Sequence, residues 1–138
     1  MKKKRERDQV TLERVKRQLE KGLRAKNPEQ VIKQLASYFL QYLTPENLQA
    51  AIEQNMDITS AIYNHYGLTH PVILPVFRAA MRLYWREFEE FITNVPRLYQ
   101  LLAKDPRNRP ILETDRAKQY LNQQCENFYL TTYQIVWG

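Results

Sequence analysis

Five basic residues share one edge of a predicted helix near the N-terminus, and we call them the basic edge. At 100° per residue they fall within about 100° of one another, and they are Arg7, Arg14, Arg17, Lys21 and Arg24. The run Lys2, Lys3, Lys4 and Arg5 extends the positive charge toward the first residue. Basic side chains on such an edge lie about 5–6 Å apart, close to the spacing of phosphates along a nucleic acid strand. Because a row of Lys and Arg releases condensed counterions on binding, the edge predicts sequence-independent binding to a phosphate backbone.

The opposite side of the same helix carries a narrow apolar stripe, made of Leu12, Val15, Leu19 and Leu23. The stripe predicts packing of this helix on a neighbouring molecule or on the rest of the chain. Glu6, Glu13 and Glu20 flank the basic edge, so a second interpretation is an ordinary solvated face. A third is binding to a membrane surface or an acidic protein, although the stripe has no Trp or Phe to insert into a membrane.

A second basic row lies on a later segment, where Arg78, Arg82 and Arg86 repeat every four residues. Three arginines on one helix edge could contact phosphates. They could equally pair with Glu89, Glu90 or carboxylates on another helix, and the sequence does not decide between the two.

Residues suited to catalysis or metal binding are few and badly spaced. His65 and His70 are five residues apart with Gly67 between them, which does not place them on one helical turn. The single cysteine, Cys125, lies on an apolar stripe and is expected to be a buried packing residue. Carboxylates on neighbouring helical positions, as at Glu89 and Glu90, point apart. We therefore expect no enzyme activity, no metal and no cofactor.

The charge is unevenly distributed along the chain. Residues 1–33 hold twelve Lys and Arg and five Asp and Glu, whereas residues 34–138 hold nine and ten. The first quarter thus has a net charge of +7 and the remainder −1. No apolar run approaches the roughly 18 residues of a membrane span, and no apolar stretch follows the basic start as in a signal peptide. This asymmetry predicts a basic arm joined to a neutral body.

The pattern of prolines and apolar residues predicts an all-α protein. Asn27, Thr44 and Asp105 each precede a proline, and Thr114 precedes an acid, so each is a candidate helix start. Helical periodicity covers 9–26, 29–43, 46–54, 58–66, 72–94 and 114–136, with one or two turns within 97–104. The expected fold is a small helical bundle, residues 28–138, with an extended basic N-terminal helical arm, residues 1–27.

Aromatic residues are frequent, with nine tyrosines and two tryptophans. Most lie at positions expected to face a helical core, although stacking on single-stranded bases is another use. Tyr133, Trp137 and the apolar run around them suit a subunit interface.

The segment Tyr66–Pro71 (Tyr-Gly-Leu-Thr-His-Pro), the long basic and aromatic segment after it, and the pair Phe128-Tyr129 with Tyr133 resemble the major coat proteins of rod-shaped and filamentous archaeal viruses, the rudivirus and lipothrixvirus type. The resemblance implies a structural protein of the virion, present in the host cytoplasm before assembly. It implies a homodimer, or a heterodimer with a related coat protein, built into a helical polymer, and it is compatible with a membrane envelope.

The same resemblance implies that the N-terminal helices wrap linear double-stranded DNA held in the A form. Residues 2–5 and the basic edge would then contact DNA, and Arg78, Arg82 and Arg86 would contribute secondarily. The alternative function is a small helical transcription regulator or polymerase inhibitor, since the two short helices within 46–66 could imitate a DNA-reading motif. A helical adaptor with no nucleic acid role is a third.

Overall fold

The computed structural model describes the backbone of residues 2–138 and the side chains of residues 12–138 other than Ile92. Within this part the chain is all-α, with nine α-helices, one short 3-10 helix and no strand, which confirms the predicted class. The elements are α1 (Lys2–Ala25), α2 (Pro28–Tyr42), α3 (Pro45–Gln54), α4 (Ile58–Tyr66), α5 (Leu74–Leu83), α6 (Trp85–Ile92), α7 (Val95–Leu102), η1 (Pro106–Asn108), α8 (Arg109–Leu112) and α9 (Asp115–Trp137).

Most helices begin where a polar side chain caps free backbone N–H groups. The Asn27 side chain accepts a hydrogen bond from the N–H of Glu29, Thr44 accepts one from Asn47, and Thr114 accepts one from Ala117. A proline follows the cap of α2 and of α3, where its missing N–H costs nothing. These caps explain why the predicted starts of α2, α3 and α9 agree with the structure to within a residue.

The predicted long helix over 72–94 is wrong, because the segment forms two helices that meet at Tyr84. The chain bends there with φ −113° and ψ 29°, although no proline or glycine is present. Hydrogen bonds from Tyr84 N–H to Ala80 and from Phe88 N–H to Tyr84 continue across the bend. The bend directs the apolar faces of both α5 and α6 into one core, where Phe77, Met81, Tyr84, Phe88 and Phe91 are all buried. Burial of these side chains outweighs the preference for a straight helix.

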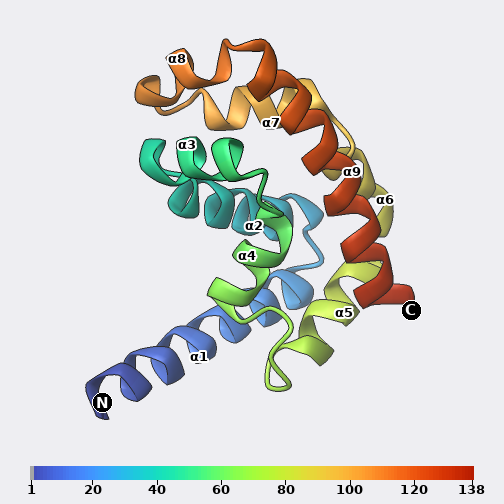
Figure 1. Ribbon diagram of the computed structural model, residues 1–138. Coiled ribbons are helices and arrows are strands. Elements are labelled where there is room, and N and C mark those ends of the chain that lie inside the picture. The colour runs from blue at the N-terminus through green and yellow to red at the C-terminus, as the bar shows by residue number, and fades with distance from the viewer. Residues whose placement is uncertain (1) are drawn as a thin grey trace.

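The last helix, α9, is the central support of the molecule. It contacts α3, α4, α5, α6, α7 and α8, and Figure 1 shows it running along one side of the molecule from α8 to α5. Its inner face includes a fully buried hydrogen bond of 2.7 Å between the hydroxyls of Tyr63 and Thr132. Gln124, also buried, accepts a hydrogen bond of 3.0 Å from the N–H of Ile58 at the start of α4. These polar contacts fix the register of α9 against α4.

From Leu12 onward, α1 packs on the rest of the chain through its apolar stripe. Val15 and Leu19 are buried, and Leu12 and Leu23 pack against the same core. A Cβ atom at Gly22 would lie 2.6 Å from Cγ2 of Val31, so glycine permits α1 and α2 to cross at this distance. Of the two arrangements that the stripe predicted, the structure therefore has packing on the body.

The loop after α4 receives the N-terminal end of the same apolar stripe, at Leu12. Gly67 has φ +69° and ends α4 in a left-handed conformation that suits glycine. A Cβ atom at Gly67 would overlap Cδ2 of Leu12. Two glycines at close approaches thus hold residues 12–25 of α1 against α2 and against the end of α4.

Candidate nucleic-acid interface

Within the described part of α1, the basic edge divides into a paired side and an unpaired side. Arg17 pairs with Glu13 at 3.4 Å, and Arg24 pairs with Glu20 at 3.1 Å. Neither Arg14 nor Lys21 has a carboxylate within ion-pair distance among the side chains that the structure describes. Both side chains are exposed. Arg14 and Lys21 are therefore the residues of the edge best placed to receive an external anion.

The two unpaired cations lie on the side of α1 that faces α2. At 100° per residue, Arg14 and Lys21 lie about 40° and 60° from Gln18, whereas Glu13 and Glu20 lie about 140° and 160° from it. Gln18 marks the direction of α2, because its side-chain oxygen accepts hydrogen bonds from Gln34 Nε2 and, at 3.2 Å, from the Tyr38 hydroxyl. The paired carboxylates thus lie away from the surface that α1 shares with α2.

The hydrogen bonds of Gln18 to Gln34 and Tyr38 fix the rotation of α1 relative to α2, because these side chains are partly buried. Gln34 Nε2 also donates to the Tyr38 hydroxyl at 2.7 Å. Burial raises the pKa of Tyr38 to about 12, although the hydrogen bond from Gln34 lowers it. Tyr38 is therefore a neutral hydroxyl at physiological pH, which joins α1 to α2 without adding negative charge beside the basic edge.

The ion pairs of Arg17 and Arg24 do not remove these arginines from the candidate interface. Their side chains are 78% and 79% exposed, and the pairs join residues four apart on one helix. Exposed pairs of this type contribute only about 0.3–0.5 kcal/mol. A phosphate that approached could replace the carboxylates at low cost.

Five other predicted DNA-binding residues, Lys2, Lys3, Lys4, Arg5 and Arg7, have side chains outside the described residues. The structure therefore neither supports nor weakens their predicted role.

The second basic row holds the C-terminal end of α9 to α5. Arg78 Nε donates to the carbonyl of Ile135 at 2.8 Å, and Arg82 Nε donates to that of Val136 at 3.0 Å. The Arg82 guanidinium also lies 5.5 Å from the ring centroid of Trp137. These contacts satisfy carbonyls in the last turn of α9, and they place positive charge at the negative end of the helix dipole.

Arg78 and Arg82 thus contact backbone carbonyls and not carboxylates, and their contact with phosphates stays a prediction. Arg86, one turn further along, is exposed and has no hydrogen bond or ion pair among the described side chains. The terminal nitrogens of all three arginines remain available to other ligands. Arg78 and Arg82 in addition hold the end of α9 through their Nε atoms.

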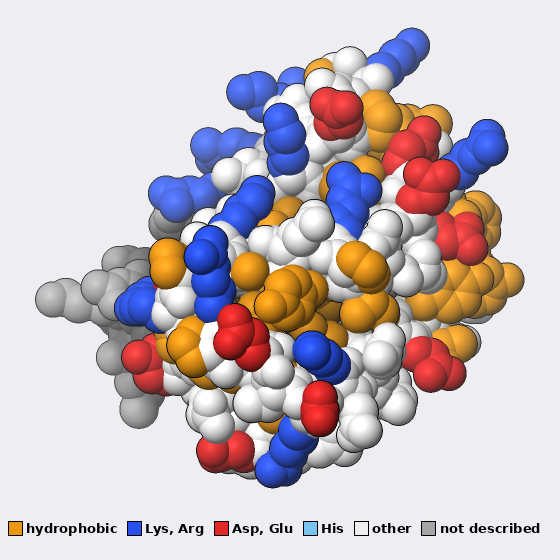
Figure 2. Space-filling view, turned by 90° about the horizontal axis from the view of Figure 1, so that it is seen from above, with side chains coloured by type: hydrophobic (Ala, Val, Ile, Leu, Met, Phe, Trp, Pro, Cys, Tyr) orange, Lys and Arg blue, Asp and Glu red, His pale blue; other side chains and the backbone are white. Residues whose placement is uncertain are grey.

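The view in Figure 2 shows Lys and Arg side chains gathered over the upper left of the molecule, with acidic side chains more frequent at the right. The exposed cations include three that sequence reasoning did not select: Lys33 on α2, Arg97 on α7 and Lys104 just after α7. They come from distant parts of the sequence and form no periodic row, so no pattern in the sequence indicated them.

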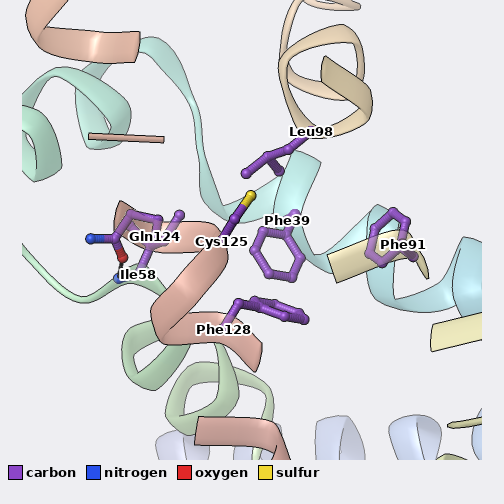
Figure 3. A pocket seen from close by; sticks show the side chains of 7 residues that line it. All are labelled: Phe39, Ile58, Phe91, Leu98, Gln124, Cys125 and Phe128. Carbon is purple, nitrogen blue, oxygen red and sulfur yellow. Dashed lines mark hydrogen bonds between the residues drawn. The ribbon is translucent and has the colours of Figure 1, made fainter. Parts of the chain in front are cut away.

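Cys125 is buried, as expected, in an apolar surrounding. It lines a cavity of about 10 Å³ with Phe39, Ile58, Phe91, Leu98, Gln124 and Phe128 (Figure 3). A space of this size holds at most one water molecule. Burial raises the pKa of the thiol to about 11, so the thiolate needed for nucleophilic attack is scarce at neutral pH.

The two histidines are exposed and do not meet. His65 lies beside the ring of Tyr42, with centroids 5.3 Å apart, and His70 Nδ1 accepts a hydrogen bond from the N–H of Val72 at 3.2 Å. Across the described residues, no group of three or more His, Cys, Asp or Glu side chains is arranged to hold a metal ion. Nor does any described helix have a stretch long and apolar enough to cross a membrane.

Aromatic side chains form a partly exposed cluster where α6 meets the end of α9. The ring of Trp85 lies 5.9–6.0 Å from those of Tyr129, Tyr133 and Trp137. Two of these rings, Tyr133 and Trp137, are 47% and 45% exposed, and the exposed apolar residues Leu83, at the end of α5, and Leu130, on α9, are 59% and 56% exposed. We call these four residues the α9 patch.

No protein-family model, no curated protein and no solved structure matches this chain.

Proposed function

We propose that this protein coats double-stranded DNA by binding its phosphate backbone without sequence preference. The observation that carries the proposal is the pair of exposed cations, Arg14 and Lys21, that lack carboxylate partners in the described structure. The helix that bears them is fixed by buried contacts of Val15 and Leu19, so the cations are presented on a rigid support. The net charge of +7 over residues 1–33 attracts a polyanion to this side.

The coat-protein part of the proposal is supported by the layout of the chain. A basic N-terminal helix on an all-α body is the arrangement that the resemblance to archaeal rod-shaped and filamentous virus coat proteins implies. In this proposal residues 2–11 extend the basic edge as an arm along linear DNA, and the DNA is held in the A form. Neutralised phosphates and excluded water favour that form, and binding depends on backbone shape and not on base edges.

The assembly part of the proposal uses the α9 patch as a contact with a second copy of the chain. The patch contains uncharged, mainly apolar side chains on the surface, and such clusters mark interaction sites. A protein that covers DNA stoichiometrically meets other copies of itself more often than any other partner, so we commit to a second copy as the occupant. The action is structural and requires no catalysis.

The transcription-regulator alternative has less support. α4, which would have to enter the major groove, contains neither Lys nor Arg. Its exposed side chains are Ser60, Asn64 and His65. As a recognition helix, α4 would therefore lack the cations that usually anchor a recognition helix to flanking phosphates.

The DNA-binding claim is tested by the salt dependence of binding to linear duplex DNA. Removing one phosphate contact reduces the slope of log K against log salt by about 0.9, so Arg14→Gln with Lys21→Gln should reduce it by about 1.8. A matched control is Arg116→Gln with Lys118→Gln, which removes the same charge from the start of α9, far from α1 in Figure 1. An equal reduction in both double variants would show a net-charge effect and would contradict the proposed site.

Assembly is tested separately, by electron microscopy of the protein mixed with linear duplex DNA and by sedimentation of the protein alone. Leu83→Ser with Leu130→Ser should abolish filaments and self-association. Met56→Ser with Val72→Ser, which changes exposed apolar residues outside the α9 patch, should preserve both. Filaments that form normally without Leu83 and Leu130 would refute the patch as the contact.

A further inference from the structure

A groove between α2 and α7 is lined by three cations. It has a volume of about 290 Å³, and its basic side chains are Lys33, Arg97 and Lys104, with Gln100 between the last two. Ile32, Ala36, Phe91 and Leu101 form its apolar surface. Among the described side chains that line it, none is a carboxylate. Three cations around one hollow without a compensating acid repel one another, and an anion in the groove would relieve this repulsion.

The three cations are free to bind such an anion. No ion pair between described side chains includes any of them. The Arg97 guanidinium lies 5.5 Å from the ring centroid of Phe91, and this stacking orients the group and leaves its donors available. The N–H of Arg97 is itself bonded to the Asn94 side chain at the start of α7, so the backbone under the guanidinium is fixed.

The groove is connected to the basic edge of α1. Lys33 also lines a second hollow, of about 350 Å³, together with Asn27, Glu29, Gln30 and Gln34 at the turn between α1 and α2. Gln34 is the residue bonded to Gln18 of α1, on the side where Arg14 and Lys21 lie. The surface from α1 to α7 therefore presents cations and side-chain amides, and Glu29 is its one carboxylate among the residues that line the two hollows.

We propose that the groove between α2 and α7 binds a phosphate group of the nucleic acid, so that the DNA-binding face runs from the basic edge of α1 across α2 to α7. Lys33 and Lys104 supply point charges, and Arg97 supplies a planar pair of donors that matches two phosphate oxygens. The apolar surface of the groove receives the sugar carbons next to that phosphate. This inference rests on the proposed function, and it places phosphate contacts on the body as well as on α1.

The groove is tested first with inorganic tripolyphosphate, followed by amide chemical shifts of the full chain at low salt. Saturable shifts are expected at Lys33, Arg97 and Lys104, and Lys33→Gln with Lys104→Gln should weaken this binding at least fivefold. Arg116→Gln with Lys118→Gln removes equal charge elsewhere and should leave it unchanged. The absence of saturable shifts at the groove would overturn the inference whether or not the protein binds DNA.

The second experiment uses linear duplex DNA. Lys33→Gln with Lys104→Gln should reduce the salt slope by about 1.8, beyond any reduction in the control pair. Wild-type binding with an unchanged slope in the groove variant would overturn the inference and leave the proposed function standing. If the wild-type chain does not bind DNA while tripolyphosphate saturates the groove, the proposed function fails and the anion site stands.

Discussion

Gly22 controls how closely α1 approaches α2, and Gly22→Ala is the sharpest test of that packing. The added methyl would lie 2.6 Å from Cγ2 of Val31, whereas carbon atoms in contact lie about 3.5–4.0 Å apart. Val31 is 2% exposed, so its methyl group cannot move toward solvent. Either α1 shifts outward by roughly 1 Å or the Val31 side chain leaves its preferred rotamer, which a β-branched residue in a helix resists.

The expected magnitude follows from two opposing effects. Replacing glycine by alanine inside a helix normally stabilises it by about 1 kcal/mol. Overpacking a close contact normally costs about 1–3 kcal/mol. Because the approach is 2.6 Å and the neighbour is a stiff, buried side chain, we expect the second effect to be larger. The free energy of unfolding should fall by about 1 kcal/mol.

Urea unfolding followed by circular dichroism measures this change, and Val31→Ala provides the control. When the methyl groups of Val31 are absent, Gly22→Ala no longer meets them and should stabilise the protein by about 0.5–1 kcal/mol. The sign of the Gly22→Ala effect should thus reverse between the two backgrounds. Stabilisation by about 1 kcal/mol in the wild-type background would refute the close packing of α1 on α2.

Three further predictions concern other parts of the molecule. Tyr63→Phe leaves the buried hydroxyl of Thr132 without its partner and should cost about 1–3 kcal/mol in urea unfolding, while Tyr63→Phe with Thr132→Val should cost less than the sum of the single changes. The folded-state pKa of Cys125, about 11, is above its ordinary value of 9.0, so its contribution to stability is complete below pH 9 and is lost as the pH rises to 11. Between pH 8 and pH 10.5 the free energy of unfolding should therefore fall less in Cys125→Ala than in the wild type. An equal fall in the two proteins would contradict the buried thiol. Arg82→Ala removes a hydrogen bond to the end of α9 and should cost about 1 kcal/mol, whereas Arg86→Ala should change the unfolding free energy by less than about 0.5 kcal/mol, and equal costs would argue against the capping role.

The starts of α2, α3 and α9 were predictable because a local capping interaction sets each of them. Asn27, Thr44 and Thr114 accept hydrogen bonds from their own chain within three residues, so their effect is visible in a short stretch of sequence. The bend at Tyr84 was not predictable in this way. It arises because two successive helices bury their apolar faces in one core, and that requirement depends on residues far away in the sequence.

In the candidate interface, too, features set by local sequence were predictable and features set by tertiary packing were not. The basic edge follows from helical periodicity, and the pairing of Glu13 with Arg17 and of Glu20 with Arg24 follows from their spacing of four. The groove at Lys33 could not be predicted, because its cations meet only after α2 and α7 have packed together. The role of Arg82 at the end of α9 depends on tertiary packing for the same reason.

The docking of α1 has a consequence for how the chain is made. Its partners are α2, α4 and α5, and all three are translated after it. At about 5–20 residues per second, Val15 and Leu19 leave the ribosome several seconds before α5 is available to pack on α1. During that interval part of a cationic, amphipathic segment is exposed next to ribosomal RNA. The close fit of Gly22 against α2 can form first, and the packing of α5 ends the exposure.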